Sequence, residues 1–418
     1  MMEQMHSGEK LSGRQNVSKY RWVILFTTIP VIIATEMMWL TLSPISSIAE
    51  DFYGVSTMAV TVFTMSYMIM FIIFSIPASW VIDRFGYRVS LFIGAGLTGI
   101  FGLTRGLFAD SFMIVMASQF LIAAGQPFLL NITTKIAANW FPQNERATAA
   151  GLLTMAQYLG FAIAMVLSPL IAEKSGIPRV LMIFAVVGAA AAALSMICSR
   201  ERPAAAPPGP AAEKEDFSLG TLKELAGKGP YMLTMFIAFI SMGIFNTVLT
   251  LIESILMPRG IGPAETGVIG GAFVLAGVAG AIVIPVISDK TGKRIPFLIA
   301  TIIALVPLYL GLTFFGSFSV LTADAGIAGF LIMGVAPVLF QHGSEVAYPV
   351  QEGTSLGMIL LMGQISGVAF VFLFEILGKL TGGAAAPMLM LVALTVLEIP
   401  FTMKMKESEM NIRRLKDE

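Results

Sequence analysis

Twelve long apolar segments, separated by short polar loops, constrain this chain more than any other feature. Each is about 20 residues or longer, the length at which an α-helix crosses the roughly 30 Å hydrocarbon core of a bilayer. Hydrophobic residues make up 56% of the chain and charged residues only 12%, too few to cover a water-soluble surface. We therefore predict an all-α membrane protein with twelve transmembrane helices at 20–49, 57–82, 88–108, 111–140, 145–173, 178–198, 231–258, 264–288, 295–316, 319–346, 353–380 and 384–404.

The net charge of the chain and its small number of metal-binding residues exclude several functions. The formal net charge is zero, so nothing predicts a nucleic-acid partner. Cys198 is the only cysteine, and His6 and His342 are the only histidines, so we expect no disulfide, no metal and no other cofactor. No nucleophile or acid pair stands at a spacing that suggests an enzyme. The expected partners are a small-molecule substrate and the lipid bilayer, and we expect a monomer.

A polar linker divides the apolar segments into two groups of six. It contains Pro-Pro-Gly-Pro at 207–210, typical of a flexible connection, and then a stretch at 219–226 that can form a short surface helix. No cleavable signal peptide is evident before the first long apolar segment. The expected organisation is a cytoplasmic N-terminal tail (1–19), an N-terminal six-helix half (20–198), a cytoplasmic linker (199–230), a C-terminal six-helix half (231–404) and a cytoplasmic C-terminal tail (405–418).

Basic residues predict the orientation, because cytoplasmic loops retain Lys and Arg. With both termini inside the cell, 20 of the 26 Lys and Arg residues fall in inner segments and four in outer loops. Lys135 and Arg105 fall within spans, and we expect Arg105 at a membrane interface, near the end of the third span. The sequence thus predicts a multi-pass cell membrane protein with cytoplasmic termini, and its compact loops favour a prokaryotic inner membrane.

Two short strings recur at nearly the same spacing in the two halves. Asp-Arg-Phe-Gly-Tyr-Arg at 83–88 corresponds to Asp-Lys-Thr-Gly-Lys-Arg at 289–294, an offset of 206 residues (289 − 83). Met-x-Gln-x-x-Gly at 155–160 recurs at 362–367, an offset of 207 (364 − 157). Two agreeing offsets indicate a duplicated six-helix unit. Parallel repeats of this kind place a substrate site between the halves, which rock about it during transport.

These strings also carry a family resemblance. The loop at 83–88 resembles the loop between helices 2 and 3 of the major facilitator superfamily, and Asn-Glu-Arg-Ala at 144–147 resembles the start of that superfamily's helix 5. Within the superfamily, the segments at 51–59, 76–80 and 344–355 are most similar to the feline leukaemia virus subgroup C receptor (FLVCR) family. The resemblance covers both halves. It implies the major facilitator fold, alternating access, and a substrate such as choline, ethanolamine or haem.

Trp39 and Glu36 are the leading substrate-binding candidates. They lie three residues apart on one helical face, and an indole beside a carboxylate suits an organic cation. Trp39 also matches, by its spacing to Phe-Tyr-Gly at 52–54, the tryptophan that stacks on the quaternary ammonium of choline in the FLVCR family. The alternative is a tryptophan that serves packing or lies against lipid.

The resemblance adds further candidates but also departs from the family pattern. Gln364 matches a family glutamine of helix 11 that lines the cavity, although it could equally make an interhelical hydrogen bond. In helix 7, Phe245 is followed by Asn246 where the family has a tyrosine, and in helix 5 Gln157 and Tyr158 replace an Asn-Gln pair. An amine with fewer methyl groups, or another small metabolite, would fit almost as well as choline.

Polar residues of the fourth span complete the candidate site. Gln126 and Asn131 are expected to contact substrate, and Asn131 shares a helical face with Lys135. Lys135 matches a basic residue of the family. It could bind an anionic group, reach the membrane surface or take part in a gate.

Acids within the spans raise the question of coupling, since a carboxyl group in a dry cavity can carry a proton. Glu36, Glu253 and Glu345 are the candidates, and Glu345 is as well suited to a gating contact. Glu398 is expected to reach the inner membrane surface. A proton-coupled transporter of another metabolite, drug or haem, with Glu36 as the coupling acid, is therefore the alternative to an amine transporter.

Charged loop residues are the expected gate. Asp83 at the end of helix 2 can form an ion pair with an Arg or accept hydrogen bonds from the backbone N–H groups at a helix N-terminus. Either contact would hold the halves together in the outward-open state. The alternative is that these charges only set topology. The full set of gating candidates is Asp83, Arg84, Arg88, Glu145, Arg146, Asp289, Lys290, Arg294, Lys135 and Glu345.

Overall fold

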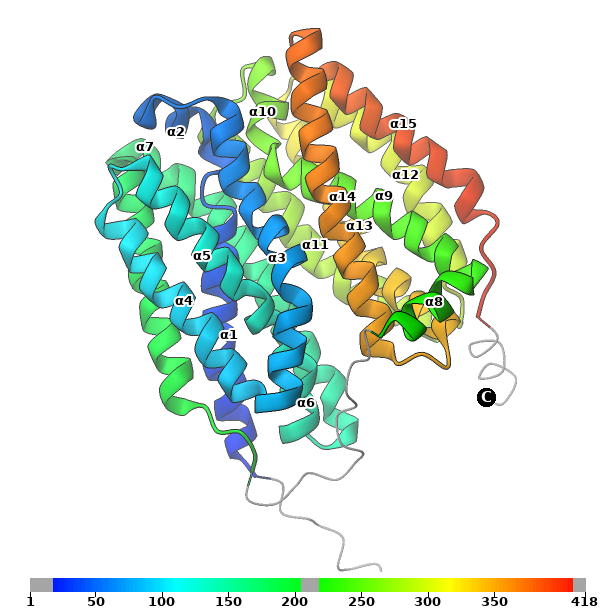
Figure 1. Ribbon diagram of the computed structural model, residues 1–418. Coiled ribbons are helices and arrows are strands. Elements are labelled where there is room, and N and C mark those ends of the chain that lie inside the picture. Colours follow the sequence, from blue (N-terminus) through cyan, green and yellow to red (C-terminus); the bar gives the residue numbers. More distant parts are fainter. Residues whose placement is uncertain (1–17, 204–217, 409–418) are drawn as a thin grey trace, which may run out of the picture.

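The described part of the computed structural model, residues 18–203 and 218–408, is two helical bundles packed side by side (Figure 1). No strand occurs in these ranges. The predicted tails, apart from their innermost residues, and residues 204–217 of the predicted linker lie outside the described residues. The N-terminal half contains α1 (Tyr20–Trp39), η1 (Ser43–Ile45), α2 (Ser46–Tyr53), α3 (Thr57–Phe85), α4 (Tyr87–Leu107), α5 (Phe112–Leu130), α6 (Ile132–Trp140), η2 (Gln143–Glu145) and α7 (Arg146–Cys198).

The second bundle follows a short surface helix, α8, where the sequence predicted one. Helix α8 spans Leu219–Gly227. The C-terminal half then contains α9 (Gly229–Thr250), α10 (Ile252–Leu256), η3 (Met257–Arg259), α11 (Pro263–Thr291), α12 (Ile295–Phe314), α13 (Phe318–Ala347), α14 (Glu352–Thr381) and α15 (Ala385–Thr402).

Eleven helical segments in the described ranges are long and apolar enough to span a membrane. One of them, α7, has 53 residues, and a straight helix of that length would measure roughly 80 Å, far more than a bilayer. Gly176 breaks its path with φ 75° and ψ 170°, backbone angles that favour glycine. The two segments of α7 on either side of Gly176 therefore supply the fifth and sixth predicted spans. The first predicted span is likewise interrupted, between Trp39 and Ser43.

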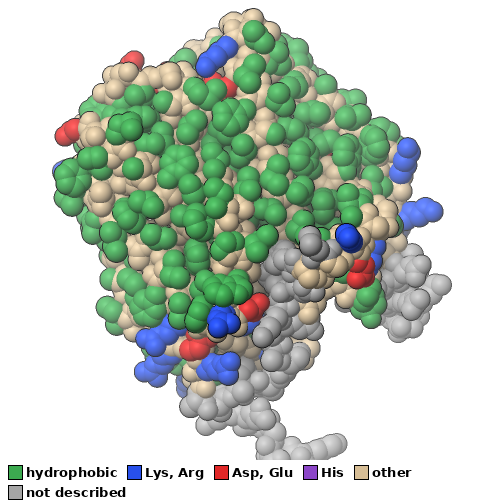
Figure 2. Space-filling view, in the orientation of Figure 1, with side chains coloured by type: hydrophobic (Ala, Val, Ile, Leu, Met, Phe, Trp, Pro, Cys, Tyr) green, Lys and Arg blue, Asp and Glu red, His purple; other side chains and the backbone are tan. Residues whose placement is uncertain are grey.

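The outer surface suits lipid. Figure 2 shows hydrophobic side chains over most of the visible face, and Lys and Arg side chains gathered at the lower end of the N-terminal half. Large apolar side chains such as Leu275, Ile303 and Val396 are about half exposed, at 54%, 49% and 46%. Exposing such a surface to water is unfavourable, whereas exposing it to the hydrocarbon of a bilayer is not. The chain is a multi-pass membrane protein.

A capping contact recurs in both halves and adds a third element to the repeat. The carboxylate of Glu201, just after α7, accepts hydrogen bonds from the backbone N–H groups of Tyr87 and Arg88 at the start of α4. Glu407, just after α15, accepts in the same way from Arg294 and Ile295 at the start of α12. The two acids are 206 residues apart (407 − 201). Each anion neutralises the positive end of a helix dipole.

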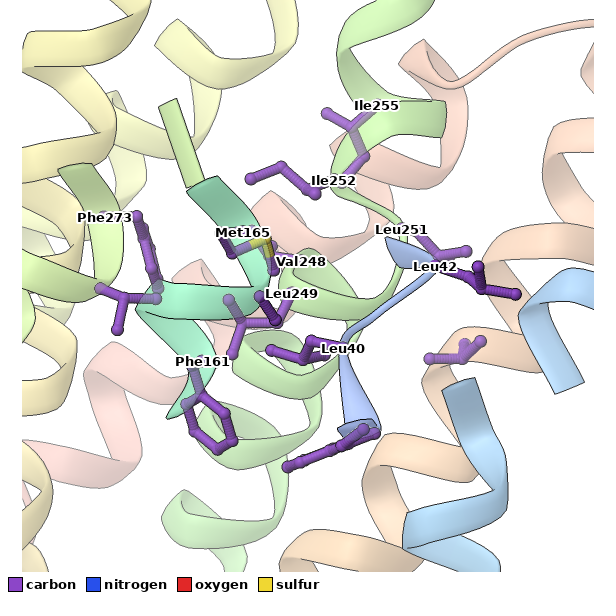
Figure 3. Close-up of a cluster of buried hydrophobic side chains, with 14 of the residues drawn as sticks. Leu40, Leu42, Phe161, Met165, Val248, Leu249, Leu251, Ile252, Ile255 and Phe273 are labelled. Carbon is purple, nitrogen blue, oxygen red and sulfur yellow. The ribbon is translucent and has the colours of Figure 1, made fainter. Parts of the chain in front are cut away.

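The two halves contact each other mainly at one end of the molecule, which we term the closed end. Ser43 donates to the backbone oxygens of Leu249 and Thr250, and Thr61 donates to Glu375 at 3.1 Å. Apolar side chains from both halves pack together at this end (Figure 3); those labelled are Leu40, Leu42, Phe161, Met165, Val248, Leu249, Leu251, Ile252, Ile255 and Phe273. We term the opposite end, which carries Asp83 and Arg294, the open end.

Candidate substrate site

A central cavity of about 150 Å³ lies between the halves, and residues from both halves line it. Most of the wall is apolar, with a few polar groups. Among the candidates from the sequence, those that line the cavity are Trp39, Gln126, Gln157, Tyr158, Phe245, Asn246 and Gln364. Ser241 and Thr301 also line it, and the sequence analysis did not select them. A largely apolar cavity with a few convergent polar groups is the usual form of a small-molecule site.

Trp39 is the last residue of α1 and is held from three sides. Its Nε1–H donates to the backbone oxygen of Thr64 at 2.9 Å. The indole stacks on Tyr67, with ring centroids 5.7 Å apart and an interplanar angle of 10°, and Phe161 meets it edge-on at 5.2 Å. Only 5% of the residue is exposed. Tyr67 therefore lies against the indole and restricts the approach of a ligand to it.

Arg105 fixes the point at which α1 ends. Its Nη1 donates to the backbone oxygen of Met38 at 3.2 Å and to the side-chain oxygen of Gln119. Gln119 donates to the same Met38 oxygen at 3.2 Å. A cation at a helix C-terminus is favourable, and here Arg105 shares with Gln119 and Thr41 a carbonyl at the end of α1. The expectation of an interfacial Arg105 was wrong, because this residue is fully buried beside Trp39.

Glu36 lies behind the cavity wall. The residue is fully buried, and its Oε1 accepts a hydrogen bond from Nε2 of Gln126 at 2.8 Å. Its other oxygen, Oε2, has no hydrogen-bond partner among the described residues. Because Gln126 donates to Glu36 and also lines the cavity, it presents its carbonyl oxygen as a free acceptor. Glu36 therefore does not line the cavity itself, but it orients the Gln126 amide group that does.

Glu398 occupies a similar place in the other half. It is 1% exposed, and both carboxylate oxygens accept from the hydroxyl of Ser241, at 2.9 and 3.1 Å. Ser241 lines the cavity. The expectation that Glu398 reaches the membrane surface was wrong, because α15 turns this side chain toward α9 in the interior.

Asn131 lies outside the central cavity. It lines a second cavity of about 280 Å³ at the open end, together with Asp83, Lys135 and the C-terminal half's Glu352. Its amide donates to the backbone oxygen of Ser75 and to the Ser79 hydroxyl, both at 3.1 Å. Lys135 pairs with Asp83 at 3.0 Å. These residues therefore belong to the open end.

The remaining gating candidates of the N-terminal half interact within that half. Glu145 pairs with Arg21 at 3.2 Å, and Arg146 donates to the backbone oxygen of Phe141. Arg88 lies over the ring of Phe92 at 5.2 Å. The guanidinium of Arg84 lies 5.8 Å and 5.7 Å from the ring centroids of Trp80 and Phe85.

The gating candidates of the C-terminal half form a second cluster. Arg294 lies between two acids, 3.2 Å from Asp289 and 2.7 Å from Glu345. Lys290 is exposed. Each of these contacts joins residues of one half, as expected where the halves are apart. Their role as a latch between the halves stays a prediction.

Glu253 lies at the closed end rather than in the substrate cavity. Its carboxylate accepts from the Ser46 hydroxyl at 2.8 Å, from the Ser47 backbone N–H at 3.1 Å and from the Ser47 hydroxyl. The acid belongs to α10 and the serines begin α2, so the contact joins the halves. Burial raises the pKa of Glu253 above its ordinary 4.5, although the serine hydrogen bonds act in the opposite direction.

We expect the closed end to be favoured by acid. In the closed arrangement the Glu253 pKa is raised, whereas in water it would return to about 4.5. The protonated group thus stabilises closure fully below that value, and this contribution is lost as pH rises through the raised pKa. Spin labels at Asp51 and Met257, with Cys198 changed to Ser, would report the distance between the halves at this end.

Glu253→Gln should reduce that pH dependence and favour the closed end at neutral pH. Glu50→Gln is the matched control, because Glu50 lies at the same end but accepts from Thr57 of its own half. An unchanged pH response in Glu253→Gln would contradict the assignment.

The comparisons with known proteins agree with this architecture. The profile of the Major Facilitator Superfamily matches residues 22–371. The chain belongs to this superfamily of membrane transporters. A bacterial homolog of the human lysosomal transporter Spinster, solved in an inward-facing and unoccupied conformation, has the same fold: the TM-score is 0.71 at 15% identity, over 92% of this chain and 96% of that one.

Relatives by sequence place the chain near the FLVCR family. It is 30% identical over 394 residues to the MFS-type transporter C09D4.1 of Caenorhabditis elegans, covering 89% of this chain but only 66% of that protein. It is 28% identical to solute carrier family 49 member A3 of Xenopus tropicalis, over 88% of this chain and 80% of the relative. The choline/ethanolamine transporter FLVCR1 of Felis catus is 27% identical, over 87% and 68%. The predicted resemblance is confirmed: this is an FLVCR-like transporter of the major facilitator superfamily.

Proposed function

We propose that this chain transports a small organic amine resembling choline or ethanolamine, by alternating access through the central cavity. The observation that carries the proposal is the composition of the cavity wall. Trp39 and several amide side chains line it, two buried acids lie one hydrogen bond behind it, and none of the described lining residues is a Lys or Arg. Such a wall favours a cation. The FLVCR-family relatives named as choline/ethanolamine transporters support the same substrate class.

We further propose that the structure is the inward-facing state. Lys and Arg side chains gather at the open end of the N-terminal half (Figure 2), which by the charge rule faces the cytoplasm. The apolar cluster of Figure 3 then separates the cavity from the outside. In the outward-facing state this cluster parts, and charged groups of the open end, such as Asp83 and Arg294, come between the closing halves. Both termini are cytoplasmic in this arrangement.

Thermal stabilisation of the purified protein tests the substrate class, since a ligand that binds the folded state stabilises it by mass action, about 2.7 kcal/mol at 100 times its dissociation constant. We expect choline or ethanolamine to raise the melting temperature of the wild type and of Trp80→Ala, but not of Trp39→Ala. Trp80 is the control because it is 57% exposed on the outer surface. If carboxylates or haem raised the melting temperature and amines did not, the amine assignment would be contradicted.

One observation favours a second candidate, a proton-coupled transporter of another metabolite, drug or haem. Oε2 of Glu36 is buried and has no hydrogen-bond partner in the described part of the chain, the condition under which a carboxyl group holds a proton. In sealed liposomes, a pH gradient should then drive uptake by the wild type and by Glu50→Gln but not by Glu36→Gln. Flux that follows the substrate gradient alone would instead identify facilitated transport.

A further inference from the structure

The central cavity has a matched polar feature on each side. In the N-terminal half, Glu36 accepts from Gln126, and in the C-terminal half Glu398 accepts from Ser241. Gln126 and Ser241 both line the cavity, whereas the two acids are buried behind it, at 0% and 1% exposure. Each half therefore contributes one hydrogen-bonding group that is backed by an acid.

Ser241 is oriented by Glu398 as an acceptor toward the cavity. A hydroxyl has one proton, and Ser241 directs it to the carboxylate, at 2.9 and 3.1 Å from the two oxygens. Only its lone pairs remain for a ligand. Glu398 forms no ion pair with a Lys or Arg in the described part of the chain, so its ionised form is balanced only when a cation enters the cavity. A carboxylate buried in this way is costly unless a cation comes near it.

Two of the aromatic side chains that line the cavity already stack on other rings. Tyr67 lies against Trp39, and Phe273 lies against Phe245 with ring centroids 6.0 Å apart. Asn246 donates its amide to the backbone oxygen of Gly363 at 3.1 Å. A quaternary ammonium ion needs open aromatic faces, because it has no N–H to donate. An ammonium ion with N–H groups can instead donate to Ser241 and Gln126.

We infer that Glu398, acting through Ser241, is a positioning residue that makes the cavity select ammonium ions carrying N–H groups over quaternary ammonium ions. This inference rests on the proposed function, namely that the cavity takes an amine. Glu398 does not contact the ligand; it holds the Ser241 proton away from the cavity and makes the hydroxyl oxygen a stronger acceptor.

Dissociation constants of ethanolamine and choline, measured by calorimetry on the purified protein, test the inference. The wild type should bind ethanolamine about tenfold more tightly than choline, because only ethanolamine has N–H groups that can donate a charge-assisted hydrogen bond to Ser241. Glu398→Gln and Ser241→Ala should weaken ethanolamine about tenfold and change choline by less than about threefold. Ser241→Thr keeps the hydroxyl and should keep the selectivity. Asp324→Asn, another buried acid of the C-terminal half that lies outside the cavity wall, is the control and should leave the ratio unchanged.

The outcomes separate this inference from the proposed function. Equal weakening of both amines in Glu398→Gln and Ser241→Ala would indicate a structural role and overturn the selectivity inference alone, as would a wild type that prefers choline. Choline binding also reports that each variant is folded. A wild type that binds neither amine would overturn the proposed function and this inference with it.

Discussion

Arg105→Met is expected to destabilise the protein by about 3 kcal/mol, because the change removes a buried cation with its hydrogen bonds and leaves the side-chain oxygen of Gln119 without this donor. Arg105 has no exposed surface, and its guanidinium contacts Met38, Gln119 and, at 3.5 Å, the Thr41 hydroxyl. Methionine has a similar length, so lost packing contributes little. The end of α1 would lose its fixed position, and Trp39, the next residue after Met38, would lose its place in the cavity wall.

The change should lower the thermal unfolding midpoint in detergent and weaken amine binding together. Arg105→Lys keeps the charge but not the fork of donors, and we expect an intermediate effect. Arg179→Met, an exposed arginine of α7, is the control and should leave both quantities near their wild-type values. If Arg105→Met melted like the wild type, the role of Arg105 at the helix break would be refuted.

Gly329→Ala is expected to have a comparable effect, on the order of 3 kcal/mol, through overpacking. A Cβ at Gly329 would lie 1.9 Å from the backbone oxygen of Phe273, and one at Gly280 would lie 1.9 Å from that of Phe330. Such contacts are impossible, so α11 and α13 would have to separate. Close approach at small residues is a main source of helix association in a membrane, where no water is expelled. The yield of monodisperse protein and its melting midpoint should both fall.

Gly326 supplies a matched control on the same helix, three residues earlier. A Cβ there would have its nearest neighbour, the Cβ of Ala276, at 3.9 Å, which is ordinary contact. Gly326→Ala should therefore be neutral or stabilising by up to about 1 kcal/mol, through helix propensity. If the two variants melted alike, the packing argument would fail.

The architecture was largely predictable from the sequence. Spans of apolar residues must be helical in lipid, because every backbone group needs an internal partner. The repeated loop at 83–88 and 289–294 indicated two related halves, and the superfamily match is consistent with that organisation. The fifth and sixth predicted spans are both present, as the segments of α7 on either side of the break at Gly176. The prediction missed the caps made by Glu201 and Glu407, which join segments more than 100 residues apart.

Individual polar residues were harder to place than helices. Trp39 and Gln364 do line the cavity, as their resemblance to the FLVCR family implied, although ligand contact by either stays a prediction. Arg105 and Glu398 were expected near the membrane surface and are instead buried. Their positions along the chain are compatible both with the membrane surface and with the protein interior. Only the direction of each side chain relative to the neighbouring helices distinguishes them.

The sequence by itself determined the number and order of membrane-crossing segments, their grouping into two halves and the superfamily, because these depend on hydrophobic length and on motifs within short stretches of chain. The tertiary structure alone decided which polar groups meet: Glu36 with Gln126, Glu398 with Ser241, and Glu253 with the start of α2. The physical reason is that a helix in lipid is apolar on nearly all sides, so its sequence carries little information about which face packs inward. That choice is made by close packing and by the pairing of buried polar groups, and it determines the chemistry of the cavity.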